Sequence, residues 1–144
     1  MTEEQITLTL IRHLKSNDWF VITFDYPQSG TGILIRPDNT DNKSDGFIPD
    51  IVAYKNGMVL FFENKDRFVF SDFEKVKRLK NDNSYASAIK RLLGKFNYEV
   101  IKFGIGLPNI KKEVGKAIAH KDLVDFIFTV DPENHMVHTQ YYAE

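Results

Sequence analysis

The sequence predicts an α/β protein in which a central mixed sheet is flanked by helices. Three observations favour this class: apolar side chains recur at helical spacing near the start, a strong hairpin signal follows, and helix-like segments then alternate with strand-like ones. At 144 residues the chain is long enough to bury a core without disulfides or a structural metal. We therefore expect a single domain over residues 1–144.

The first third of the chain begins with an amphipathic helix from Glu3 to about Lys15, because its apolar residues gather on one side of a helical wheel. The aromatic and β-branched run Trp19–Phe24 predicts a strand that ends before Pro27. Ile33–Ile35 is expected to form a short strand. The Pro, Asp, Asn, Ser and Gly content of residues 36–46 is typical of an exposed loop.

Two further strands, Phe47–Tyr54 and Met58–Glu63, are joined by Asn56-Gly57. This dipeptide tolerates positive φ at both central positions of a type I′ turn, so it is the strongest hairpin signal in the sequence. The remainder of the chain reads as helices at 73–79, 86–93 and 111–120, and as strands at 98–107, 123–130 and 137–142. Within these elements we expect a core in the order α-β-β-β-α-β-α-β.

A two-residue turn at Asn56-Gly57 fixes which residues face each other across the hairpin. It sets Asp50 opposite Glu63 at a non-hydrogen-bonded pair, with Lys65 on the same face at the end of the strand. Two opposed carboxylates destabilise a sheet unless a cation compensates them. Oxygen ligands from two carboxylates, completed by water and phosphate, suit Mg²⁺. The alternative is a surface hairpin with ordinary exposed charges.

Charge is unevenly distributed although the formal net charge is only −1. Residues 75–121 hold 12 Lys and Arg against 3 Asp and Glu, whereas residues 1–74 hold 7 against 12, and residues 122–144 hold none against 5. A strongly basic segment in a near-neutral chain favours contact with a phosphate backbone, and a solvated helix face is the alternative. The absence of cysteine excludes thiolate zinc sites and cysteine nucleophiles.

Pro49-Asp50 followed by Glu63-Asn64-Lys65 resembles the PD-(D/E)XK motif of restriction endonucleases and Holliday-junction resolvases. The resemblance covers residues 3–107 and implies a restriction-endonuclease-like core. It also implies that Asp50 and Glu63 hold Mg²⁺, for which Mn²⁺ could substitute, that Lys65 assists the attacking water, and that Glu3 on the first helix contributes a further acid. Asn64 departs from the family, in which the middle residue of the triplet is usually apolar.

The resemblance thus implies a metal-dependent endonuclease that hydrolyses phosphodiester bonds in DNA. Four basic residues on the helices after the motif are expected to contact nucleic acid: Lys75, Arg78, Lys90 and Arg91. Ser29 or Thr31, in a small-residue loop, is a weaker candidate to assist at the site. We expect a cytoplasmic protein without a membrane segment, acting as a homodimer or as a subunit of a larger nuclease complex.

Two other functions stay open from the sequence. One is a catalytically degenerate nucleic-acid-binding or scaffold subunit on the same fold, which the polar Asn64 leaves possible. The other is an α/β domain with an unrelated partner, in which Asp50, Glu63 and Lys65 would not converge. Fold alone cannot separate these functions, because function depends on the site.

Overall fold

The structure is a computed structural model that describes residues 1–27, 32–38 and 46–144. Its helices are α1 (Glu3–Ser16), α2 (Phe70–Asn81), α3 (Ala86–Leu93) and α4 (Lys111–Ala119), with short 3₁₀ turns η2 (Asn83–Tyr85) and η3 (Lys121–Leu123). Its strands are β1 (Phe20–Phe24), β2 (Ile51–Lys55), β3 (Met58–Asn64), β4 (Val100–Pro108), β5 (Phe126–Val130) and β6 (Val137–Tyr142). Among the described residues, no helix is long and apolar enough to cross a membrane.

The six strands form one sheet in the order β1-β2-β3-β4-β5-β6. The pairs β1–β2, β2–β3 and β5–β6 are antiparallel, while β3–β4 and β4–β5 are parallel. The helices α2 and α3 connect β3 to β4, and α4 connects β4 to β5, as parallel neighbours require a crossover. The predicted α/β class with a mixed sheet flanked by helices is confirmed.

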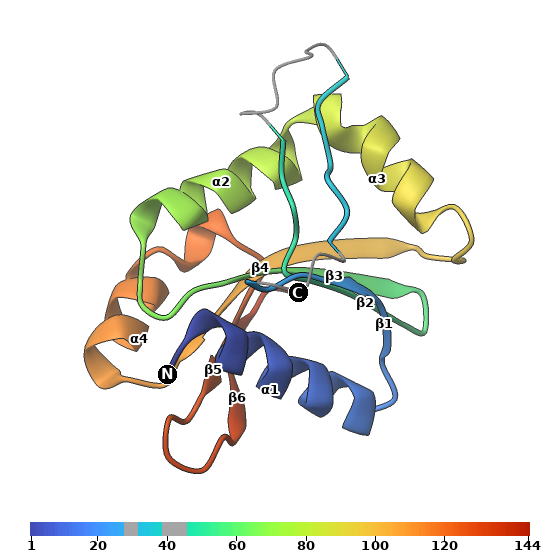
Figure 1. Ribbon diagram of the computed structural model, residues 1–144. Coiled ribbons are helices and arrows are strands. Elements are labelled where there is room, and N and C mark those ends of the chain that lie inside the picture. The colour runs from blue at the N-terminus through green and yellow to red at the C-terminus, as the bar shows by residue number, and fades with distance from the viewer. Residues whose placement is uncertain (28–31, 39–45) are drawn as a thin grey trace.

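The helices cover both faces of the sheet in three layers. Figure 1 shows α1 on one side of the sheet and α2 and α3 on the other. Alternation along β3 divides the core accordingly: Leu60 and Phe62 pack with α1, whereas Val59 and Phe61 pack with α2, α3 and α4. The same alternation sends Glu63 toward α2 and Asn64 toward α1, which decides the surroundings of both residues.

The hairpin between β2 and β3 has the predicted turn and register. Asn56 and Gly57 have φ values of 48° and 82°, as a type I′ turn requires. The ladder pairs Lys55 with Met58 and continues to Ile51 and Phe62. The turn at Asn56-Gly57 therefore sets the hairpin register that brings Asp50 close to Glu63.

Two predicted strands differ from the observed ones. Ile33–Ile35 is not a strand, because β1 already occupies the free edge of β2 and only Ile35 forms an isolated bridge, with Phe47. Ile35 and Phe47 pack in the core on the side of α2 and α3, and the predicted strand 47–54 begins only at Ile51. The predicted helices at 73–79 and 86–93 and the predicted strand at 137–142 are present as α2, α3 and β6.

Candidate metal and nucleic-acid site

Charged side chains gather where β3 ends and where the first turns of α1 and α2 meet that end of the sheet. The group contains four carboxylates and two amines: Glu3, Asp50, Glu63, Asp72, Lys65 and Lys75. The structure therefore brings together the predicted catalytic residues of the motif, the predicted acid of the first helix, and two residues of α2. Glu63 and Asp72 are buried, with 6% and 8% of their surfaces exposed.

Asp50 lies at an irregular end of the hairpin. The regular ladder stops at Ile51 and Phe62, one step before the predicted pair of Asp50 with Glu63. Instead, the Asp50 N–H donates to the carbonyl of Phe62 at 2.9 Å, and the N–H of Asn64 donates to Asp50 Oδ2 at 2.6 Å. The predicted cross-strand pair is thus replaced by a slipped strand end, in which the backbone of the second strand holds the Asp50 carboxylate.

Burial makes both carboxylates of the motif costly to ionise. Burial, and next the charge of Glu63, raise the pKa of Asp50 to about 8, against the opposing hydrogen bond from Asn64. Burial raises the pKa of Glu63 to about 7, with Asp72 acting in the same direction and Lys75 and Lys65 opposing. Because ionising these buried carboxylates is costly, they tend either to bind protons or to bind a cation.

Lys65 lies between carboxylates from two helices on opposite faces of the sheet. Its Nζ is 3.5 Å from Glu3 Oε1 in α1 and 3.7 Å from Asp72 Oδ2 in α2. Burial lowers the pKa of Lys65, but the charges of Asp72, Glu3 and Glu63 outweigh burial and raise it. The ammonium is therefore held in its charged form next to the motif carboxylates.

Lys75 was predicted to contact nucleic acid, and the structure places its amine beside Glu63 of the motif. Its Nζ is 3.6 Å from Glu63 Oε1 and 4.9 Å from the centre of the Phe47 ring. The lysine offsets part of the charge of Glu63 and is only partly exposed. Lys75 therefore belongs to the charged group at the end of β3, and its amine is not free on the helix surface.

Asp50 and Glu63 are the two carboxylates of the motif that could hold a divalent cation. Glu63 Oε2 is buried and has no hydrogen-bond partner, which is costly unless something else compensates it. No set of three His, Asp or Glu side chains stands at metal-ligand spacing in the described part of the chain. Asp50 and Glu63 would then supply two ligands and leave the others to water and phosphate, as Mg²⁺ commonly requires.

The polar side chain of Asn64 lies between β3 and α1. It is 1% exposed, and its Nδ2 donates to Thr7 Oγ1 at 3.0 Å. Asn64 Oδ1 has no hydrogen-bond partner, and it lies where a side chain at Gly106 would have to be. The middle residue of the triplet thus points into the core, where Thr7 satisfies part of its polarity.

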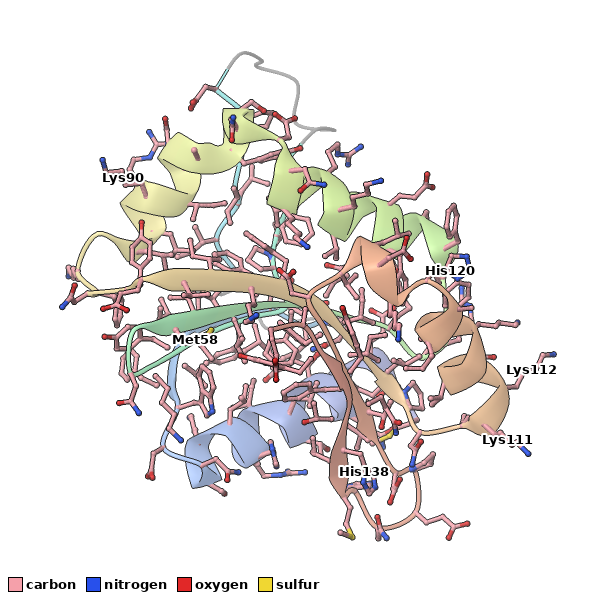
Figure 2. The ribbon with its side chains drawn as sticks, turned by 180° about the vertical axis from the view of Figure 1, so that it is seen from behind. Met58, Lys90, Lys111, Lys112, His120 and His138 are labelled. Carbon is pink, nitrogen blue, oxygen red and sulfur yellow. The ribbon has the colours of Figure 1, made fainter. Side chains whose placement is uncertain are left out.

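The other predicted basic residues lie away from the carboxylates. Arg78 on α2 and Lys90 and Arg91 on α3 are exposed, and no described carboxylate is within ion-pair distance of them. Figure 2 shows Lys90 projecting from the outer side of α3 and Lys111 and Lys112 projecting from α4. Ser29 and Thr31 lie outside the described residues.

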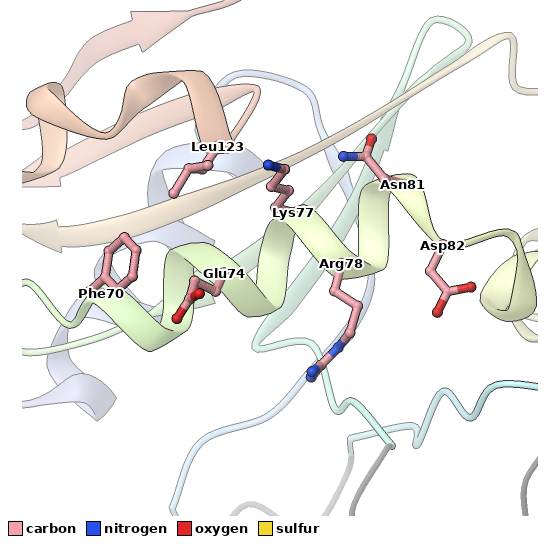
Figure 3. Close-up of a pocket in the computed structure, with 7 residues that line it drawn as sticks. All are labelled: Phe70, Glu74, Lys77, Arg78, Asn81, Asp82 and Leu123. Carbon is pink, nitrogen blue, oxygen red and sulfur yellow. The ribbon is translucent and has the colours of Figure 1, made fainter.

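A pocket of about 480 Å³ lies on the outer side of α2. Its lining includes Phe70, Glu74, Lys77 and Arg78, and Figure 3 shows these side chains along the helix with Leu123 opposite Phe70. The inner side of the same helix carries Phe73, Val76 and Leu79 into the core. The pocket and the charged group at the end of β3 are therefore separate.

Asp72 is the member of the site that the sequence analysis missed. Its only local signal is an acidic residue in the first turn of a helix, and that pattern is also common where acids merely complement the helix dipole.

Comparison of the chain with protein-family models, curated proteins and solved structures finds no match.

Proposed function

We propose that the protein is a Mg²⁺-dependent endonuclease that hydrolyses phosphodiester bonds in DNA. The observation that carries the proposal is the convergence of Asp50, Glu63 and Lys65 at the end of β3. Both carboxylates are desolvated and repel one another, and Glu63 retains a buried oxygen without a hydrogen-bond partner. A surface hairpin with ordinary charges would not show this arrangement, because exposed carboxylates stay hydrated and so avoid the cost of desolvation.

The order of the elements supports a restriction-endonuclease-like core. A helix precedes antiparallel strands that carry the motif, and helices then lead to a strand that pairs parallel with β3. The motif sits at the end of a central strand of the sheet, where helices from both faces begin nearby. This placement accords with the resemblance of Pro49-Asp50 and Glu63-Asn64-Lys65 to the PD-(D/E)XK motif.

Each residue has a role that follows from its position. Asp50 and Glu63 would hold Mg²⁺, which supplies charge stabilisation at the scissile phosphate and activates a water molecule. The Lys65 ammonium adds positive charge on the same side and stabilises the negative charge that develops on the phosphate oxygens. Glu3 contacts Lys65 and so acts on the site through that amine.

Exposed basic residues offer a path for the DNA backbone. Arg78, Lys90 and Arg91 lie on the two helices that cover the same face of the sheet as Glu63. Their charges would attract phosphates without reading sequence. Because one site cleaves one strand, cleavage of both strands calls for a homodimer or for assembly into a larger nuclease complex.

The second candidate is a nucleic-acid-binding subunit that does not cleave. It is favoured by the contacts of the lysines, since Lys75 already offsets Glu63 and Lys65 already offsets Glu3 and Asp72. The two lysines offset part of the charge of the carboxylates, which lessens the need for a metal. The two candidates share the basic helices and differ only in whether a cation displaces Lys75 from Glu63.

The test is a cleavage assay on supercoiled plasmid, branched DNA and single-stranded DNA. Each substrate is incubated with purified protein in Mg²⁺, in Mn²⁺ and in EDTA. The nuclease proposal predicts cleavage with either metal and none in EDTA, and the preferred substrate reveals the shape that the site accepts. Binding without cleavage of any substrate in either metal would favour the non-cleaving subunit.

A further inference from the structure

Asp72 has an environment that a structural carboxylate would avoid. It lies in the first turn of α2, directed inward with Phe73 and Val76, and 8% of its surface is exposed. Its Oδ2 is buried and has no hydrogen-bond partner, and burial raises its pKa. A buried, incompletely satisfied carboxylate destabilises a fold, so it needs a neighbour that compensates it.

The amine of the motif lies within ion-pair distance of Asp72. Lys65 Nζ is 3.7 Å from Asp72 Oδ2, and on its other side it is 3.5 Å from Glu3 Oε1. A lysine side chain has a flexible four-carbon stem and a compact charge, so one partner alone leaves it mobile. Two carboxylates from opposite faces of the sheet restrict the ammonium to the space between them.

The two partners of Lys65 are not equivalent. The side chain of Glu3 is 38% exposed and that of Asp72 is 11% exposed, so water and salt weaken the contact with Glu3 more than the contact with Asp72. The backbone N–H of Lys65 donates to the carbonyl of Gly106, which fixes the base of the side chain. Asp72 then fixes its far end.

We propose that Asp72 is a positioning residue that holds the Lys65 ammonium at the motif carboxylates, and that it does not bind the metal. This inference rests on the proposed function, because it assigns Asp72 a part in the same site. It makes the first turn of α2 part of the catalytic machinery. Loss of Asp72 would leave Asp50 and Glu63 in place but would let Lys65 leave the position where it stabilises the phosphate.

The matched control is Glu74, two residues further along the same helix. Its side chain is exposed and lines the pocket on the outer side of α2, so Glu74→Gln removes the same charge from the same helix without touching the site. Asp72→Asn removes the charge at nearly constant volume, and Asp72→Ser does so with a smaller side chain. Asp72→Glu restores the carboxylate at a longer reach.

The first measurement does not depend on activity. Carbon relaxation at Lys65 Cε in the metal-free protein reports the order of the side chain. We expect Asp72→Asn and Asp72→Ser to lower this order clearly, Asp72→Glu to restore part of it, and Glu74→Gln to leave it unchanged. Unchanged order at Lys65 in both Asp72→Asn and Asp72→Ser would overturn the proposal, even if the wild-type protein cleaves DNA.

The second measurement separates positioning from metal binding. In steady-state cleavage we expect Asp72→Asn to lower kcat about 10- to 100-fold with little change in KM, because a misplaced catalytic group costs rate at constant binding. Calorimetric Mg²⁺ affinity should stay within about 2-fold of wild type, whereas Asp50→Asn should abolish it. Equal loss of Mg²⁺ affinity in Asp72→Asn would make Asp72 a ligand and contradict the proposal. A wild-type protein that cleaves nothing would overturn the proposed function, and the relaxation data would still decide whether Asp72 holds Lys65.

Discussion

The backbone N–H of Asn64 donates a 2.6 Å hydrogen bond to Asp50 Oδ2. This bond joins the two halves of the motif, which are 14 residues apart in the chain. It orients the Asp50 carboxylate beside Glu63 although the regular ladder has already ended at Ile51 and Phe62. A backbone donor does not depend on the identity of residue 64, so the polar Asn64 does not prevent a functional arrangement.

The first prediction concerns stability at Asp50. Above about pH 8, where both carboxylates are ionised, Asp50→Asn removes one of two buried like charges while an oxygen that can accept from Asn64 remains. We expect the metal-free protein to gain about 1 kcal/mol of unfolding free energy, and we expect Mg²⁺ to stop raising the melting temperature. Thermal unfolding with and without Mg²⁺ measures both effects. A variant that is less stable than wild type without metal would show that the carboxylate is structural.

The second prediction concerns pH. The pKa values of Asp50 and Glu63 are raised to about 8 and about 7, so the folded protein binds more protons than the unfolded chain above about pH 4. The stability that this proton binding contributes is present at low pH and is lost as pH rises through the folded pKa values. Denaturant unfolding in EDTA between pH 5 and pH 8.5 should therefore show falling stability across this window.

Two further results would accompany that pH dependence. Mg²⁺ affinity should rise over the same window, because the metal competes with protons for the carboxylates. The double variant Asp50→Asn with Glu63→Gln should flatten the stability profile between pH 5 and pH 8.5. If the slope persisted in the double variant, other groups would be its source.

The third prediction uses two glycines as a matched pair. A Cβ at Gly106 would overlap Asn64 Oδ1 and would lie 2.7 Å from Leu10 Cδ1, so Gly106→Ala should displace Asn64 and cost about 1–3 kcal/mol. A Cβ at Gly115 in α4 meets nothing within 4 Å, so Gly115→Ala should stabilise by about 0.5–1 kcal/mol. Urea unfolding compares them, and equal effects would contradict the close packing of Asn64 on Gly106.

The fourth prediction concerns the basic helices. Substituting Arg78, Lys90 and Arg91 together by Ala should weaken binding to DNA of any sequence. It should also reduce the slope of log affinity against log salt by about 1 for each phosphate that the variant no longer neutralises. Lys15→Ala, at an exposed site in the last turn of α1, is the control. Fluorescence anisotropy at several salt concentrations gives both quantities. An unchanged slope in the triple variant would place the nucleic-acid surface elsewhere.

Local signals in the sequence were sufficient for the hairpin and for most of the elements. Asn56-Gly57 determines a turn of known geometry, so the register from Lys55–Met58 onward could be read directly. The slip at Asp50 could not, because it depends on how the strand meets the preceding loop. The predicted strand at Ile33–Ile35 was wrong because β1 pairs with β2 and only Ile35 of the three residues enters the core, whereas Ile33 and Leu34 are exposed.

Only the site residues that the hairpin brings together could be predicted from the sequence. Asp50, Glu63 and Lys65 belong to one local unit, whereas Asp72 reaches Lys65 only through the packing of α2 on the sheet. Lys75 was expected on the helix surface because the sequence shows that the residue is basic but not where its side chain points. Its amine instead faces Glu63 and Phe47, an arrangement that follows from the phase of α2.

The most direct test measures Mg²⁺-dependent DNA cleavage by wild-type protein, Asp50→Ala and Lys65→Ala, purified in parallel. We expect wild-type protein to cleave in Mg²⁺ and not in EDTA, and each variant to lose at least about 100-fold in rate, because Asp50 would hold the metal and Lys65 would stabilise the reacting phosphate. Equal cleavage by all three proteins would reveal a contaminating nuclease or another site. Either that result or no cleavage by wild type would contradict the assignment of catalysis to Asp50, Glu63 and Lys65.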